Sequence, residues 1–380
     1  MRKLLKNLIT FCSLWIGAIV LVIVAEDSGV FRLNNLNSLA MDWMLLFEKG
    51  DFWSYNQDIA VILIDDVTLL DYPARSPTNR VLLSELIDAL NSVRVRKIGL
   101  DYLFDRVTID DRALFDSISR SVAKIVVGTS GDSSIYWPYE LVDIEKDILS
   151  RMQSVDRGHL MIGPSFPGWL ALEDPVIREH IPYASDGTAS FACALASAGD
   201  ACSDYEVIRW SIGSDQRSDV FPTFRLPRHI PNEARDVVFD RVVGSWGQIL
   251  EGRIVIVGSA LVGQDQHLTP LGIFDRKREF GAIIHAHIVG QMLNEQPLRN
   301  LNSTEHYSIV VLLLSLSFCY GFLIERKSGI FVLSSSILLC IASIVLFRYG
   351  DIVLTLATCI ASVVFGSLFG KFGKWLFTKK

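Results

Sequence analysis

Ile59-Ala-Val-Ile-Leu-Ile-Asp65 is an unbroken apolar run that ends in an acid. A run with no polar face is typical of a strand in a parallel sheet that is covered on both sides. Outward along the chain, similar runs lie at Lys97 to Phe104, Lys124 to Thr129 and Gly252 to Ser259. Together these runs predict a mostly parallel sheet.

Helical patterns separate the predicted strands. From Asn79 to Val93 apolar residues recur at helical spacing, and helices are also expected at Asp111 to Val122 and Gly281 to Leu293. Strands that alternate with helices in this order predict an α/β domain of three layers with right-handed crossovers. From 132 to 239 the pattern dissolves, and the one element predicted there is a helix at Thr188 to Ser197.

Four stretches are free of Asp, Glu, Lys and Arg over the roughly 20 residues that a helix needs to cross a bilayer. They are Asn7 to Ala25, His306 to Ile324, Ser328 to Phe347 and Ile352 to Gly370. The sequence therefore predicts four transmembrane helices, one N-terminal and three C-terminal. The alternative for the first is a cleaved signal peptide, but its apolar run is long for one, and Ile23-Val-Ala25 lacks the small residue expected before a cut.

The charges that flank these stretches assign the sides of the membrane, because cytoplasmic loops are rich in Lys and Arg. Basic residues precede the first stretch, separate the second from the third and follow the fourth: Arg2, Lys3, Lys6, Arg326, Lys327, Lys371, Lys374, Lys379 and Lys380. We therefore expect the first helix within residues 1–25, an exported domain at 26–304, three helices within 305–370 and a cytoplasmic tail at 371–380.

The exported segment is acidic. Residues 26–304 carry 26 basic and 39 acidic residues, which gives a net charge of −13. Such a surface repels phosphate backbones and anionic headgroups, so the sequence argues against nucleic acid or a peripheral lipid surface as a partner of this domain. Cations, neutral ligands and basic proteins stay open.

Cys193 and Cys202 are the cysteines that fall outside the predicted spans. An oxidising compartment favours a disulfide between them, which would close a short loop around Gly199. The alternative is one buried and one exposed free thiol, because spacing alone does not establish the geometry of a bridge. The other four cysteines, Cys12, Cys319, Cys340 and Cys359, lie within the spans, where a thiol behaves as a small apolar group.

A stripe of small residues marks the fourth span. Ser362, Gly366 and Gly370 recur every four residues, which allows another helix to approach closely. The neighbouring helix belongs either to the same bundle or to a second copy in a homodimer. The spans carry no ionisable residue near their centres, which argues against an ion or proton pathway.

Polar residues gather just past the predicted strands, where an open parallel sheet binds its ligands. The late strand leads into a loop, Ser259 to Leu271, and then into the helix that begins near Gly281. We predict a ligand-binding site formed by Asp65, Asp66, Asp101, Ser259, Asp265, His267, Thr269 and His285.

Two interpretations of this cluster stay open. Oxygen and imidazole ligands suit divalent cations, and the residues that offer them are Asp65, Asp101, Asp265, His267 and His285. Alternatively these residues cap helices and shape turns, since an Asp at a strand end often accepts backbone amides. His287, two places from His285 and so on another helix face, is expected in the core.

Catalytic motifs are missing from the sequence. It contains no nucleophile elbow, His-Glu-x-x-His, Lys-bearing phosphate loop or paired Cys-x-x-Cys. The cofactor is therefore left unknown, and the residues argue against an enzyme. An extracytoplasmic metal-dependent hydrolase is the alternative that the Asp and His cluster keeps open.

Four motifs follow one another along the chain. They are apolar-Ile-Asp65-Asp66 before a helix, Asp101-Tyr-Leu-Phe104, the loop from Gly258-Ser259 to Asp265-x-His267-x-Thr269-Pro-Leu271, and Gly281-x-x-x-His285-Ala286. In this order and spacing they resemble the CHASE2 family of extracytoplasmic sensory domains, over residues 30–300. The resemblance implies the sensor of a transmembrane receptor, here in a bacterial inner membrane with the large domain periplasmic or extracellular, and an unidentified ligand.

The chain departs from that family at two points. The family commonly carries a Trp-Pro-Trp-Pro-Arg-like stretch after the first strand, whereas this chain has Tyr72-Pro-Ala-Arg75-Ser-Pro-Thr-Asn-Arg80, where Arg75 or Arg80 is expected to replace the basic residue. CHASE2 receptors usually continue into a signalling enzyme, whereas this sequence stops ten residues after Gly370. We therefore expect a sensor that acts through a separate signalling protein, with an oligomeric membrane scaffold as a further alternative.

Overall fold

The computed structural model describes residues 12–22, 40–42, 44, 58–72, 75–76, 78–131, 139–152, 155–161, 176–208, 210, 221–229, 238, 240–270, 278–324, 328–350 and 352–378. Contacts within the chain divide it into two compact units. One is Lys49–Pro297, which holds a sheet, and the other combines Met1–Glu48 with Leu298–Lys380, which holds long apolar helices.

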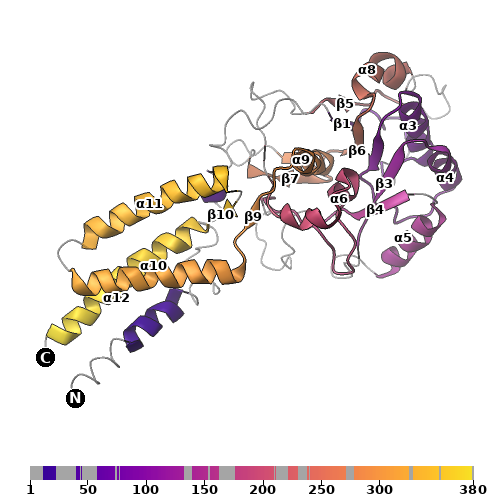
Figure 1. The fold of residues 1–380 in the computed structure, drawn as a ribbon. Coiled ribbons are helices and arrows are strands. Elements are labelled where there is room, and N and C mark those ends of the chain that lie inside the picture. The colour runs from indigo at the N-terminus through magenta and orange to yellow at the C-terminus, as the bar shows by residue number, and fades with distance from the viewer. Residues whose placement is uncertain are drawn as a thin grey trace. The chain divides into compact units, whose positions relative to one another are not determined.

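Six parallel strands form the sheet (Figure 1). They are β1 (Ile59–Asp65), β2 (Lys97–Leu100), β3 (Lys124–Thr129), β4 (Val155–His159), β5 (Thr223–Arg225) and β6 (Ile254–Ala260). Their order in space is β4-β3-β2-β6-β1-β5, and each described pair of neighbours is parallel. The predicted α/β class and mostly parallel sheet are confirmed, and β1 and β3 have the predicted bounds.

Of these six strands, β6 comes last in the chain, but in the sheet it lies between β1 and β2. Asp65 at the end of β1 pairs with Ala260 of β6, and Leu100 at the end of β2 pairs with Val257. The carboxyl ends of these three strands therefore meet at one edge of the sheet. The predicted second strand was too long, because β2 stops at Leu100 and Asp101 already belongs to the loop.

Three helices follow the first three strands: α3 (Arg80–Ser92), α4 (Asp111–Arg120) and α5 (Tyr139–Arg151). Helix α3 begins where Asn79 accepts the amide of Leu82 at 3.0 Å, a side-chain cap that replaces a missing helical hydrogen bond. These helices share one apolar cluster with the sheet, in which Leu86 of α3 meets strand residues such as Ile62 and Val257.

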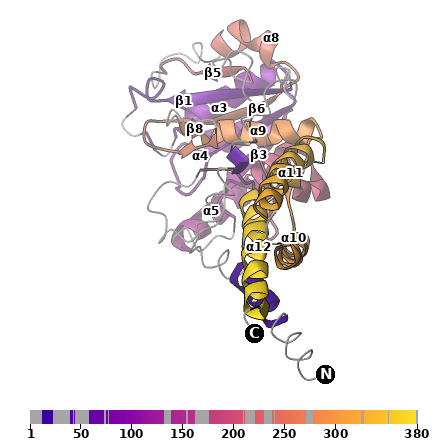
Figure 2. The same ribbon diagram turned by 90° about the vertical axis from the view of Figure 1, so that its left-hand side faces the viewer.

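Two further helices pack on the sheet, α6 (Phe191–Ala196) and α9 (Gly281–Leu293). Helix α6 contacts β2, β3 and β4. Helix α9 contacts β1 and β6 and runs along them in Figure 2. Eleven of the 13 residues of α9 are buried, so the helix is enclosed on all sides and has no exposed polar face. The predicted helix at Thr188 to Ser197 is shorter in the structure and begins at the Ser190 cap.

Smaller elements complete this unit. They are the short helices η1 (Gly199–Asp204), η2 (Asp240–Ser245) and α8 (Gly247–Leu250), and the antiparallel strands β7 (Gln266–Leu268) and β8 (Arg278–Phe280). β7 and β8 lie between β6 and α9 in the sequence. β7 belongs to the predicted loop from Ser259 to Leu271, and β8 follows that loop. Parts of residues 132–239, which the sequence left unassigned, lie outside the described residues.

The second unit contains three helices that are long and apolar enough to cross a membrane: α10 (Ser303–Leu323), α11 (Ser328–Tyr349) and α12 (Leu356–Thr378). Helix α10 starts with a capping box between Asn302 and Glu305. The predicted fourth span began too early, because Ile352–Val353 forms β10 and pairs with β9 (Arg299–Asn300). The N-terminal span is described only as the apolar helix Cys12–Val22, and the rest of it lies outside the described residues.

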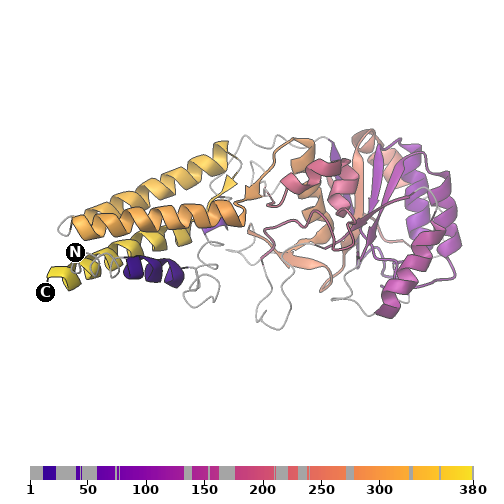
Figure 3. The same cartoon turned by 60° about the horizontal axis from the view of Figure 1, so that its bottom comes forward.

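Helices α10 and α12 pack closely side by side (Figure 3). A Cβ atom on Gly366 would lie 2.6 Å from the carbonyl oxygen of Leu314 and 2.9 Å from Cβ of Ser317, both on α10. Gly370 also lies against the backbone of α10, and the hydroxyl of Ser362 donates to the Thr358 carbonyl at 2.8 Å. The small-residue stripe is thus occupied by a helix of the same chain, which removes it as an argument for a homodimer or scaffold.

Candidate functional site at the carboxyl edge of the sheet

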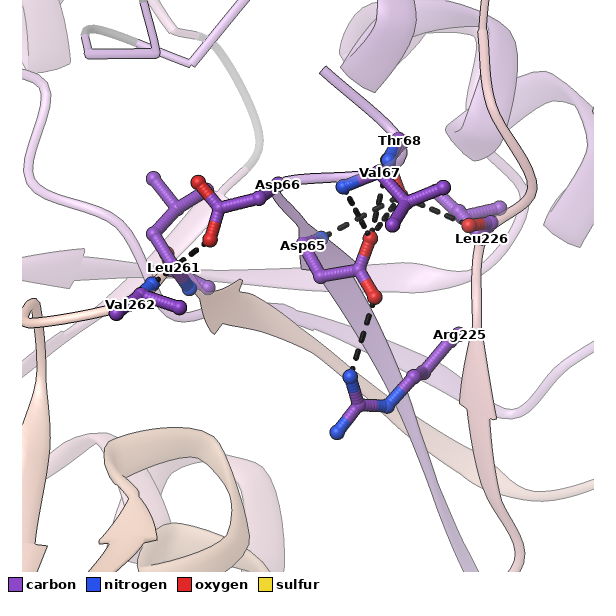
Figure 4. Close-up of polar contacts among 9 residues, drawn as sticks. Asp65, Asp66, Val67, Thr68, Arg225, Leu226, Leu261 and Val262 are labelled. Carbon is purple, nitrogen blue, oxygen red and sulfur yellow. Dashed lines mark hydrogen bonds and ion pairs between the residues drawn. The ribbon is translucent and has the colours of Figure 1, made fainter. Parts of the chain in front are cut away.

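Asp65 closes the turn that follows β1 (Figure 4). Its Oδ1 atom accepts the amides of Val67 and Thr68, each at 3.0 Å, and the hydroxyl of Thr68 at 3.1 Å. Its Oδ2 atom accepts a hydrogen bond from the Arg225 guanidinium at 3.2 Å. Both carboxylate oxygens of Asp65 accept hydrogen bonds from the protein itself. Asp65 therefore shapes the turn, as the second interpretation of the cluster expects.

Asp66 joins the loop after β1 to the loop after β6. Its Oδ2 atom accepts the amide of Val262 at 2.9 Å (Figure 4). Its Oδ1 atom pairs with Arg75. Of the two arginines that the sequence offered as the basic residue, Arg75 reaches this edge. Arg80 is buried and pairs with Asp111 at 3.1 Å instead.

Asp101 and His285 form the buried part of the edge. Oδ1 of Asp101 lies 3.8 Å from Nε2 of His285, and their side chains are 5% and 2% exposed. Among the residues that the structure describes, none is a hydrogen-bond partner of Oδ2 of Asp101 or of Nδ1 of His285. An unsatisfied buried polar atom costs about 1–3 kcal/mol, and more when it is charged. This pair therefore offers free binding atoms that the surrounding protein does not satisfy.

The electrostatic environment of this pair is dominated by burial. Burial raises the pKa of Asp101 well above its ordinary value, and the nearby charge of Asp265 raises that pKa further. Burial lowers the pKa of His285 to about 3, so its imidazole is neutral at pH 7. A neutral imidazole can act as a hydrogen-bond partner or as a metal ligand.

Asp265 and His267 form a second, more exposed pair. Nε2 of His267 lies 3.0 Å from Oδ1 of Asp265, and the side chains are 34% and 38% exposed, respectively. Asp265 has a φ of 48°, in the left-handed region that Asp tolerates better than most residues. A Cβ atom on Gly281 would lie 2.5 Å from its Oδ2 atom, so the carboxylate reaches the N-terminus of α9, where the helix dipole favours negative charge.

Ser259 and Thr269 have different surroundings. Ser259 belongs to β6, and its hydroxyl oxygen accepts the amide of Leu261 at 3.4 Å, a weak contact within its own turn. Thr269 is fully buried, and no hydrogen-bond partner of its Oγ1 atom lies in the described part of the chain. Of these two predicted ligands, Thr269 alone keeps an unsatisfied polar atom.

A family model for the CHASE2 domain matches residues 16–320. The chain belongs to the CHASE2 family. Members are extracytoplasmic sensory domains, and the match covers the α/β unit together with most of α10. No curated protein and no solved structure gave a match to the chain.

This CHASE2 chain also contains a histidine cluster that sequence reasoning missed. His180 places Nδ1 2.7 Å from the carbonyl oxygen of Tyr205 and Nε2 2.6 Å from Oγ of Ser190. His180 and His159 lie near enough to His285 that their protonated forms lower its pKa, in addition to the larger effect of burial. The two histidines lie in segments with no periodic pattern, so no sequence signal places them near α9.

Cys193 and Cys202 form a disulfide in this structure, with their Cα atoms 5.7 Å apart. With His180 they make the one group of the described residues whose metal-ligand atoms all lie within 4.8 Å of one another. The bonded sulfurs are not thiolates, and both nitrogens of His180 are hydrogen-bonded, so this oxidised group does not bind a metal. Among the described residues, no three of the predicted metal ligands (Asp65, Asp101, Asp265, His267 and His285) have their ligand atoms within 4.8 Å of one another.

Proposed function

We propose that this chain is a membrane-anchored sensor of an extracytoplasmic cue and that it signals through a separate protein. The observation that carries the proposal is the CHASE2 match, which runs without a break from the α/β unit into α10, the first of the three membrane-capable helices. The matched region thus contains both the sensory domain and most of a candidate membrane span. A conformational change in the domain can therefore reach the membrane through the chain itself.

The proposal includes finer features of topology. We infer a multi-pass protein of the bacterial inner membrane with a fourth span near the N-terminus and the large domain periplasmic or extracellular. A three-layer domain is supported by alternation along β6, because Val257 joins the cluster shared with α3, whereas the next residue, Gly258, contacts Ala282 of α9. The acidic charge of residues 26–304 and the basic flanks of the spans support the sidedness.

Close packing of α10 on α12 supports a role for the helices in transmission. Their contact leaves no room for a side chain at Gly366. In this proposal the two helices therefore move together. A displacement of α10 would therefore be carried by α12 to the cytoplasmic side. In this proposal the receiver there is a separate signalling protein.

Cysteine labelling in intact cells tests the topology. Ile109 is 97% exposed in the α/β unit, so Ile109→Cys should react with a membrane-impermeant maleimide in intact cells as fully as in lysed cells. Lys374→Cys should react only after lysis. The unsubstituted chain, whose free cysteines lie in apolar helices, measures the background. Labelling of Ile109→Cys only after lysis would overturn the exported placement.

A crosslinking experiment tests the partner. A photo-crosslinking amino acid at Lys374 should capture one signalling protein in cells, and the yield should change when the exported domain is altered by Asp101→Ala. Capture that is absent, or that is the same for both chains, contradicts signalling through a separate partner.

A further inference from the structure

We propose that reduction of the Cys193–Cys202 disulfide turns His180, Cys193 and Cys202 into a binding site for a thiophilic divalent cation, such as Zn²⁺. Cys193 lies in α6 and Cys202 in η1, whereas His180 lies in the segment between β4 and α6. All three residues lie outside the cluster that the sequence predicted. The site goes beyond the proposed sensor role, and it can hold whether or not the chain signals through a partner.

The ligand atoms of the three residues are already close together. Sγ of Cys193 lies 4.0 Å from Nε2 of His180, and the ligand atoms of all three residues lie within 4.8 Å of one another. Zinc bonds of about 2.3 Å to sulfur and about 2.1 Å to nitrogen place these two atoms about 3.6 Å apart on a tetrahedral ion. Cys193 and His180 therefore need to approach by a few tenths of an ångström.

The two sulfurs must separate once their bond is broken. On one tetrahedral zinc ion two thiolate sulfurs are about 3.8 Å apart. The Cα atoms of Cys193 and Cys202 are 5.7 Å apart, and rotation about each Cα–Cβ bond moves a sulfur without a shift of the backbone. Cα atoms at this distance therefore suit both the disulfide and a zinc ion held between two thiolates.

His180 is held in the tautomer that a metal ligand needs. Its Nδ1 atom lies 2.7 Å from the Tyr205 carbonyl oxygen, which can only accept, so in the neutral ring Nδ1 carries the proton and donates it. Nε2 then accepts the hydroxyl of Ser190 at 2.6 Å. Metal-bound histidines donate their other ring N–H to a carbonyl in the same way. A cation would replace the Ser190 hydroxyl at Nε2, and Oγ of Ser190 would keep the amide of Cys193, which it accepts at 3.1 Å.

A dithiol reductant supplies the electrons and the protons. It gives two electrons and two protons to the disulfide, so the S–S bond breaks, two thiols form and the reductant closes its own disulfide. Zn²⁺ then displaces one proton from each thiol, and both protons pass to water. The product is a cation held by two thiolates and one neutral imidazole, with water in the fourth position.

Ligand chemistry and burial select the cation. Two thiolates and an imidazole suit Zn²⁺, whereas Ca²⁺ and Mg²⁺ prefer oxygen ligands. Cys193 and Cys202 are 2% and 0% exposed, and His180 is 4% exposed. Two thiolates cancel the charge of a divalent cation, so the complex is neutral and its burial costs less than that of a lone ion.

A reductant reaches the disulfide through η1. This element is a short 3₁₀ helix, in which hydrogen-bond geometry is poor. Cys202 is its one buried residue, and its other residues, between Gly199 and Asp204, are exposed. Surface segments of this kind open locally at a fraction of the free energy of global unfolding. Opening of η1 would expose Sγ of Cys202 to the attacking thiolate.

Metal titration of the reduced and the oxidised chain tests the site. The purified full-length chain in detergent, without an affinity tag, is treated with a chelator. One half is reduced with dithiothreitol, which anaerobic gel filtration then removes, and a thiol assay in denaturant must show six thiols in place of four. By calorimetry the reduced half should bind one more equivalent of Zn²⁺ than the oxidised half. With Co²⁺ the reduced half alone should show a thiolate-to-metal charge-transfer band, a readout that needs no substitution. Absence of the extra equivalent or of the band overturns the site.

Matched variants locate the ligands. In the reduced chain Cys202→Ser and His180→Gln should each weaken Zn²⁺ binding by about tenfold or more, since even the outer-shell partners of a ligand contribute that much. Cys359→Ser removes a buried thiol in α12 and His229→Gln removes a buried imidazole elsewhere in the α/β unit, so both should keep the affinity. Affinity that Cys202→Ser and His180→Gln retain would place the cation elsewhere and refute the proposal. The labelling of Ile109→Cys tests the sensor topology by itself and depends on neither result.

Discussion

Arg80 and Arg75 are both ion-paired, but protein encloses only Arg80. The side chain of Arg80 is 1% exposed, lies 3.1 Å from Oδ1 of Asp111 and covers the ring of Phe104 at 4.4 Å. Arg75, which pairs with Asp66, is 55% exposed. Solvent screens an exposed pair, whereas loss of one partner from a buried pair leaves a charge without compensation.

Substitution of the two arginines should therefore have unequal effects on stability. Arg80→Met keeps the length and apolar stem of the side chain but leaves the Asp111 carboxylate unpaired, and it should lower the free energy of unfolding by about 3–5 kcal/mol. Arg75→Met should lower it by less than about 1 kcal/mol. Urea unfolding of the purified chain in detergent measures both, and equal losses would contradict the assignment of Arg80 as the enclosed charge.

Helix α12 owes its place beside α10 to its small residues. Gly366 lies against Leu314 and Ser317, whereas Gly329 at the start of α11 has no atom within 4 Å of its Cβ position. The two glycines lie in membrane-capable helices of similar length. They differ in whether a neighbouring backbone occupies the space that a side chain would need.

Substitution of these two glycines by leucine should show whether the stripe on α12 packs against a helix of the same chain or against a second copy. Gly366→Leu should destabilise the chain by roughly 1–3 kcal/mol or more, because the added side chain overpacks a close helix contact. Gly329→Leu should have no measurable effect. Thermal denaturation in detergent gives the stability and light scattering gives the oligomeric state. A Gly366→Leu chain of normal stability that changes only its oligomeric state would show that the stripe joins copies.

The α/β unit as a whole buries four neutral histidines. Burial lowers the pKa of His159, His180 and His287 to about 4, and that of His285 to about 3. The pKa of an unfolded histidine is about 6.5, so the unfolded chain binds more protons than the folded chain between that value and the folded pKa. Stability is therefore complete above about pH 6.5 and is lost as the pH falls toward 4. Asp101 and Glu145 oppose this trend, because burial raises the pKa of both carboxyls.

Acid should consequently unfold this unit. Each of the four histidines contributes about 1.4 kcal/mol per pH unit in that window, less the opposing contribution of the carboxyls. Urea unfolding at pH 7.5, 6.0 and 5.0 gives the number of protons taken up. His287→Phe should reduce that number by about one, because His287 packs against the rings of Trp210 and Phe221 at 5.1 and 5.0 Å and a phenyl ring suits that site. Stability that is independent of pH from 7.5 to 5.0 would refute this account.

Strands inside the sheet could be predicted from the sequence, whereas strands at its edges could not. Ile59–Ile64 of β1 and Ile125–Gly128 of β3 are continuous runs without a polar residue, because both faces of these strands are covered. Such a run can be recognised without knowledge of the neighbouring strands. β4 and β5 lie at the two edges of the sheet, and β4 has the mixed sequence Val155-Asp-Arg-Gly-His159. Edge strands are half covered, so their residues carry no such signal and the sequence left them unassigned.

The sequence predicted where the candidate site lies, but it did not predict what each of its side chains contacts. Asp65, Asp66 and Asp101 follow strands whose carboxyl ends meet at one edge, as parallel topology requires. The separate uses of these three carboxyls were not predictable, because their partners Arg225, Val262 and His285 lie far away in the sequence.

By itself, the sequence determined where this protein excludes water: the inner strands of an α/β sheet and three C-terminal helices apolar enough for a membrane. Both follow from runs of neighbouring residues, since burial of a segment depends first on its own apolarity. Only the tertiary structure decided which polar groups are satisfied, which histidines are neutral and which helix fills the stripe on α12. Those properties depend on atoms brought together from distant parts of the chain, and local sequence does not encode their distances.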